Sequence, residues 1–99
     1  MQMKYFAVIS HMVDVEKNNF YRDEHLNYLK ELGVEGKVFA KGKFIDGTGG
    51  LVIFKGDSEE SIKLLVENDP FIVHGARTYE IHEWNMTLIE KESLYNNQR

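Results

Sequence analysis

His25 is the residue whose type and spacing best suit chemistry, and it lies in the segment 22–29, RDEHLNYL. At 3.6 residues per helical turn, His25 shares a face with Leu29 and Leu32. Arg22 lies one turn earlier. An imidazole on an inward helix face can act as a general acid or base, because the unperturbed pKa of histidine is ~6.5. The alternative is a partly buried histidine that binds a backbone carbonyl.

Asp46 is the second candidate, since it opens the glycine-rich turn 46–50, DGTGG. A turn could aim this carboxylate at His25, where it would fix the ring tautomer and strengthen the other nitrogen as a base. As an ordinary turn residue, the same aspartate would bind its own backbone. Gly47 and Gly49 would let a ligand approach the backbone closely. We therefore expect a pocket with a catalytic His25/Asp46 pair and with both glycines near the ligand.

Two further side chains are candidates for ligand binding. Asp69 precedes Pro70, the only proline. The helical phase that starts at Ile62 puts Asp69 on the inward stripe, although it could simply cap the turn at the proline. Arg22 could hold an anionic group with its forked guanidinium, or it could pair with a neighbouring acid at the surface.

Composition and charge exclude several function classes. The net charge of −4 argues against a protein that coats nucleic acid. No apolar run approaches the ~20 residues of a membrane span, and no signal peptide is recognisable, so we expect a cytoplasmic protein. Cysteine is absent, and no two of the four histidines have the spacing of a helical metal site. We expect neither a metal nor a cofactor.

Hydrophobic periodicity divides the chain into six elements. We expect strands at 3–10, 37–44, 51–54 and 77–84, and helices at about 15–33 and 57–69. The strand, glycine turn and strand within 37–54 are typical of a hairpin. Asp57 or Ser58 can cap the second helix, and Pro70 ends it at Asp69.

The order β-α-β-β-α-β indicates an α+β, ferredoxin-like fold, with a four-stranded antiparallel sheet and two helices on one face. The first strand is apolar on both faces, so the uncovered face of the sheet needs a partner. A homodimer that packs sheet against sheet would supply it. We assign residues 1–84 to the domain and residues 85–99 to a polar C-terminal tail.

Several short motifs together resemble those of the YciI-like (YCII-related) family. They are Arg22-x-x-His25-Leu26-x-x-Leu29, Gly42-x-Phe44-x-Asp46-Gly47-x-Gly49-Gly50, Asn68-Asp69-Pro70-Phe71, Gly75, and Tyr79-Glu80-Ile81-His82-x-Trp84. The resemblance spans residues 3–84 in order, and the combination is more specific than any single motif. Lys43 departs from the pattern, since relatives often carry proline there, and the tail extends beyond the usual end near Trp84.

The resemblance implies a ferredoxin-like, dimeric α+β barrel. It also implies a pocket with a His/Asp pair, carried here onto His25 and Asp46 with Asp69 close by. Some proteins that resemble the family remove hydrogen chloride from chlorinated hydroxyaromatics. Neighbouring dimeric α+β barrels include lactone isomerases and monooxygenases that work without a metal, so the fold does not name the substrate.

The leading hypothesis is a small homodimeric enzyme that uses acid–base chemistry for elimination, dehydrochlorination or isomerisation of a small organic molecule. His25 would move the proton, Asp46 would orient it, and Arg22 or Lys43 would steer an anionic group. A binding or regulatory module without catalysis is the alternative. A purely structural dimerisation domain is the third hypothesis.

Overall fold

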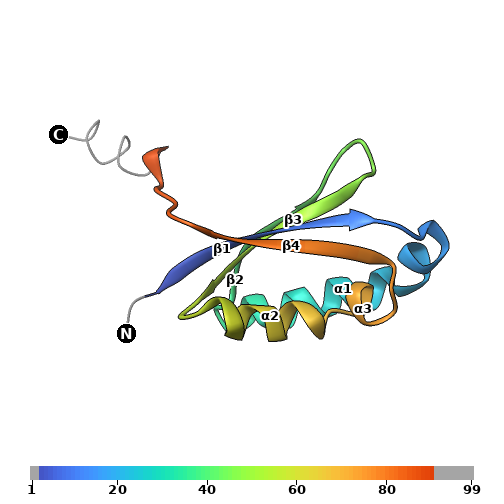
Figure 1. The fold of residues 1–99 in the computed structure, drawn as a ribbon, viewed down its shortest axis with the longest axis horizontal. Coiled ribbons are helices and arrows are strands. Elements are labelled where there is room, and N and C mark those ends of the chain that lie inside the picture. The colour runs from blue at the N-terminus through green and yellow to red at the C-terminus, as the bar shows by residue number, and fades with distance from the viewer. Residues whose placement is uncertain (1–2, 91–99) are drawn as a thin grey trace.

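The computed structural model describes residues 3–90, in which one face of a four-stranded sheet is covered by helices (Figure 1). The elements are β1 (Lys4–Met12), α1 (Val15–Val34), β2 (Val38–Lys43), β3 (Gly49–Gly56), α2 (Glu59–Glu67), α3 (Pro70–Val73) and β4 (Arg77–Trp84). The strands are antiparallel in the order β2-β3-β1-β4. This topology confirms the predicted α+β, ferredoxin-like fold. Most of the predicted tail, residues 91–99, lies outside the described residues.

Several element boundaries differ from the prediction, and two of the differences affect the site. Strand β3 begins at Gly49, because Gly49 and Gly50 already pair with His11 and Ser10 of β1. The second helix ends at Glu67, and a further one-turn helix, α3, begins at Pro70. Proline suits this first helical position, where its missing N–H costs no hydrogen bond. The sequence pattern predicted the break at this point but not the helix after it.

Helix N-termini are fixed by local side chains. Asp14 accepts a hydrogen bond from the Lys17 N–H at the start of α1, and Ser58 accepts one from the Ser61 N–H at the start of α2. Such caps satisfy backbone donors that the helix itself leaves unpaired. Of the two caps that the sequence allowed, Asp57 or Ser58, Ser58 is the one that forms. Within residues 3–90, no helix is long and apolar enough to cross a membrane.

The core lies between the sheet and the helices. Its buried members are Phe6, Val8, Leu29, Leu32, Phe54, Ile62 and Val66. Leu29 and Leu32 are buried as predicted, whereas Leu26 is 37% exposed and lines a cavity. Helices α1, α2 and α3 all lie on the same side of the sheet in Figure 1, so none of these three covers the opposite face.

The β1–β3 pairing requires glycine at position 49. Gly49 has φ of +152°, which residues with a Cβ rarely adopt, and a Cβ built there would collide with the Ser10 carbonyl oxygen. The short turn between β2 and β3 thus enters the sheet at a point of close backbone contact. This contact holds the hairpin against β1.

We predict that Gly49→Ala lowers the free energy of unfolding by about 2 kcal/mol or more, because strain and a backbone collision add. Urea unfolding of the purified chain measures the loss. Gly42→Ala on β2 is the matched control, since no heavy atom lies within 4 Å of its added Cβ. Equal stability of the two variants would contradict this account of the hairpin.

Candidate active site

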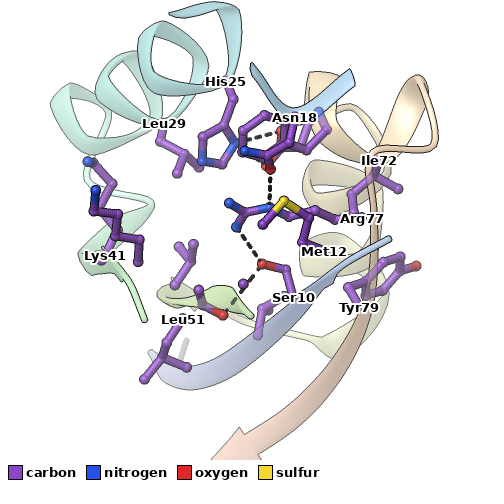
Figure 2. A pocket seen from close by; sticks show the side chains of 18 of the residues that line it. Ser10, Met12, Asn18, His25, Leu29, Lys41, Leu51, Ile72, Arg77 and Tyr79 are labelled. Atoms are coloured by element: carbon purple, nitrogen blue, oxygen red, sulfur yellow. Dashed lines mark hydrogen bonds and ion pairs between the residues drawn. The ribbon is translucent and has the colours of Figure 1, made fainter. Parts of the chain in front are cut away.

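A cavity of about 490 Å³ lies between the helix-covered face of the sheet, the β2–β3 hairpin and helices α1 and α3. Its polar wall carries Ser10, Asn18, His25 and Arg77, which Figure 2 shows grouped on one side of the hollow. Apolar side chains such as Leu29 and Val52 line much of the rest. A space of this volume and mixed lining is typical of small-molecule sites.

His25 and Asp69 form the central contact of this cavity. The Nδ1 atom of His25 lies 2.8 Å from Oδ1 and 2.9 Å from Oδ2 of Asp69. Each side chain is only 13% exposed. A carboxylate can only accept, so Nδ1 carries the hydrogen, and Nε2 of a neutral ring is left with its lone pair. The imidazole also stacks on Phe71, with ring centroids 3.9 Å apart.

Local structure places the Asp69 carboxylate. Asp69 is the N-cap of α3, with extended backbone, and its Oδ1 accepts the Phe71 N–H at 2.9 Å. The same carboxylate therefore caps the helix and holds the imidazole. Both interpretations of Asp69 made from the sequence, the cap and the inward position, describe real contacts.

Asp46 lies elsewhere. Its Oδ1 accepts hydrogen bonds from the Thr48 hydroxyl at 2.7 Å and the Thr48 N–H at 3.0 Å. These bonds, the hydroxyl first, hold the pKa of the exposed Asp46 carboxyl below its usual value. The predicted contact between Asp46 and His25 is therefore wrong, because the turn binds the carboxylate itself and Asp69 occupies the ring nitrogen.

The other predicted ligand-contacting residues line the cavity. They are Arg22 on α1, and Gly47 and Gly49 in the turn before β3 and at its start. Lys43, expected to steer an anion, also lines it from the end of β2. Their roles in ligand binding stay predictions. In the described part of the chain, no group of three or more His, Cys, Asp or Glu side chains is arranged to hold a metal ion.

Arg77 is the main site residue that the sequence analysis missed. Its Nε donates to Asn18 Oδ1 at 2.8 Å, and its Nη1 donates to Ser10 Oγ at 3.0 Å. Its Cζ lies 4.4 Å from the centroid of Phe71, the ring that His25 also contacts. Burial lowers the pKa of Arg77, and the negative charge of Asp69 acts in the opposite direction. The guanidinium nevertheless stays charged near neutrality.

A signal for Arg77 was present in the sequence. The period of a strand puts Arg77 on the same face as Tyr79 and Ile81, which pack against the core. Asn18 gave no comparable signal, because its 9% exposure follows from the contact with Arg77, 59 residues away in the chain.

Comparison with known proteins places this chain in a family. A family model described as the YCII-related domain matches residues 3–85. The chain belongs to the YCII-related family. This membership confirms the resemblance drawn from the motifs, and the matched span includes His25, Asp69 and Arg77.

Two individual proteins are also similar to this YCII-related chain. The uncharacterized protein YjpA of Bacillus subtilis (strain 168) is 31% identical over 62 residues, which cover 63% of this chain and 73% of YjpA. The structure of 5-chloro-2-hydroxyhydroquinone dehydrochlorinase (TftG) from Burkholderia phenoliruptrix AC1100, in complex with 2,5-dihydroxybenzoquinone, is similar with a TM-score of 0.73. That match has 22% sequence identity and covers 84% of this chain and 95% of TftG. At this identity, the similarity establishes the shared fold.

We predict that Asp69→Asn lowers the free energy of unfolding by about 1–3 kcal/mol, because a charge-assisted bond to His25 is lost. Asparagine still caps helices well, so the cap at α3 is largely kept and the loss reports on the ring contact. Asp46→Asn is the matched control, with an expected change of about 0.5 kcal/mol at an exposed turn. Urea unfolding near neutral pH compares the two variants. A larger loss for Asp46→Asn would contradict the assignment of the His25 partner.

Proposed function

We propose that this YCII-related protein is a small enzyme that uses His25 as a general acid–base residue and Asp69 as the residue that positions it. The observation that carries the proposal is the close His25–Asp69 contact at the wall of a 490 Å³ cavity. A carboxylate at one ring nitrogen fixes the tautomer and stabilises the imidazolium that forms when the other nitrogen takes a proton. This proposal gives Asp69 the positioning role that was first expected of Asp46.

The proposed reaction begins with proton transfer from the substrate to Nε2 of His25. In an elimination, the electron pair of the broken C–H bond forms a double bond and a leaving group departs. In an isomerisation, the imidazolium returns the proton to another atom of the same substrate. Both reactions need a base that works near neutral pH and a cavity that restricts the access of water to it. The His25 ring meets the second need, since its side chain is only 13% exposed.

The structural neighbour supports the elimination. TftG is named as a dehydrochlorinase, and its complex contains a dihydroxybenzoquinone. An elimination from a small cyclic molecule is therefore known on this fold. For this chain, we propose the same broad class of chemistry, with the identity of the substrate left to a screen.

We also propose that the protein works as a homodimer through the uncovered sheet face. Tyr5, Ala7 and Ile9 alternate with the core residues of β1 and therefore point away from the helices. A shallow hollow on this face is lined by Ala7, Ile9, Leu51, Ile53, His82, Glu83 and Trp84. Trp84 is 46% exposed there. A second copy packed sheet to sheet would bury these apolar side chains.

We predict that His25→Ala lowers kcat by about 10²–10⁴-fold on any substrate found by screening chlorinated hydroxyaromatics and small lactones. Asp69→Asn should also lower kcat, because it leaves the base wrongly oriented. Asp46→Asn should stay within about twofold, since an exposed turn residue contributes little. Product formation measured by chromatography, with circular dichroism to verify folding, tests all three. Undiminished turnover by folded His25→Ala would refute the proposal, and ligand binding without any product would favour a binding module.

We predict that light scattering gives a solution mass of about twice the 11.6 kDa of one chain. Ile9→Lys should shift the protein toward monomer, because it puts a charge in the middle of the proposed interface. Leu64→Lys on α2 is the matched control, since Leu64 is 65% exposed on the other side of the sheet. A monomeric native protein, or dissociation by Leu64→Lys alone, would contradict the proposed interface.

A further inference from the structure

The cavity carries an excess of positive charge although the chain as a whole is acidic. The formal net charge of the protein is −4. Four cationic side chains nevertheless line the cavity, namely Arg22, Lys41, Lys43 and Arg77. Asp69 is the only acidic residue among the described lining residues, and its carboxylate is already bound to His25 and to the Phe71 N–H. Clustering of one sign of charge in a cleft attracts ligands of the opposite sign.

Arg77 is the cation of this group with the most unusual surroundings. It is half-buried, and the side chains that it contacts by hydrogen bonds, Asn18 and Ser10, are neutral. Within residues 3–90, no carboxylate lies within ion-pair distance of its guanidinium. Charged side chains removed from water are normally paired with an opposite charge. Asp69 acts on this guanidinium only from beyond ion-pair distance, and its carboxylate is already bound to His25. The absence of a direct ion pair indicates a place for an anion from solution.

The guanidinium is also held rigidly with donors to spare. Arginine has five N–H donors, and the bonds to Asn18 and Ser10 use two of them. Figure 2 shows the guanidinium reaching into the hollow below His25, with Lys41 across the gap. Its Cζ atom lies over the Phe71 ring, 4.4 Å from the centroid. A planar fork with remaining N–H groups matches the two oxygens of a carboxylate.

Gly50 on β3 leaves space for the guanidinium group of Arg77. A Cβ at position 50 would lie 3.2 Å from Nη1 of Arg77 and 2.7 Å from the Gly42 carbonyl oxygen. The glycine therefore permits both the close strand pairing and the position of the guanidinium. Apolar side chains complete the cavity, including Val8, Leu29 and Val52. They suit the carbon skeleton of a small organic acid.

We propose that Arg77 binds the carboxylate of a small organic acid in this cavity, with Lys41 and Lys43 at β2 attracting the anion. This inference rests on the proposed function in one respect, namely that the bound acid is the substrate on which His25 acts. It assigns to Arg77 the anion-binding role that the sequence suggested for Arg22 or Lys43. Arg77 would be a substrate-binding residue, while His25 moves the proton.

The test uses benzoate and benzamide, which have nearly the same shape but differ in charge. Calorimetric titration of the native protein should show benzoate binding at least about tenfold more tightly than benzamide. Arg77→Met should weaken benzoate binding about tenfold or more and leave benzamide within about twofold. Lys63→Met, which removes the same charge from the exposed side of α2, is the matched control and should change neither affinity.

Two further measurements keep the test decisive if Arg77→Met folds poorly. Arg77→Lys retains the charge but not the fork, and it should still weaken benzoate binding several-fold. In the native protein, the NMR signal of the Arg77 Nε–H should shift with benzoate and not with benzamide. No such shift at saturating benzoate, or loss of binding in Arg22→Met with retention in Arg77→Met, would overturn the inference.

His25→Ala separates this inference from the proposed function. The variant should lose turnover and keep Arg77-dependent benzoate binding, because the anion is bound by the guanidinium and not by the imidazole. Arg77-dependent binding in a protein that forms no product would refute the proposed catalysis and leave the anion site standing. Turnover that depends on His25 but not on Arg77, with no benzoate binding, would refute the anion site and leave the proposed catalysis standing.

Discussion

The contact between His25 and Asp69 is the interaction on which the rest of the site depends. It joins α1 to the start of α3 across 44 residues of sequence, and its carboxylate also caps α3 through the Phe71 N–H. Phe71 in turn supports both the imidazole and the guanidinium of Arg77. The Asp69 side chain therefore fixes the start of α3 and the tautomer of His25. Through its bond to the Phe71 N–H, it also positions the ring that lines the cavity beneath His25 and Arg77. Removing it would affect structure and chemistry together.

Periodicity and local capping rules predicted the parts of this arrangement that depend on near neighbours in the chain. The order of strands and helices, the inward position of His25, and the break at Pro70 all follow from such patterns. The same patterns allowed both roles of Asp69. They could not rank Asp69 above Asp46 as the partner of His25. An aspartate before glycine gives the same sequence pattern in both cases, whether its carboxylate binds its own turn or reaches into a pocket. The structure distinguishes them by a local contact of Asp46 with Thr48, two residues away, and by a tertiary contact of Asp69 with His25, 44 residues away.

Arg77 shows a second limit of the sequence. A single charged residue at the start of a strand normally faces water. The strand period puts Arg77 on the face of Tyr79 and Ile81, but it does not identify the partners of the guanidinium. Its environment comes from β1 and α1, through Ser10 and Asn18, which lie 67 and 59 residues away in the chain. Only the assembled sheet shows that the guanidinium lies beside His25 in a cavity rich in cations. The YCII-related fold supplies the framework, and these few side chains determine what it can bind.

The most direct test of this account is the tautomer and partner of His25 in the native protein, measured by ¹⁵N NMR of the imidazole. For the neutral ring, the account predicts a hydrogen on Nδ1, an unprotonated Nε2, and a change in the Nδ1 signal in Asp69→Asn but not in Asp46→Asn. A neutral ring with its hydrogen on Nε2, or signals that respond to Asp46 and ignore Asp69, would contradict it.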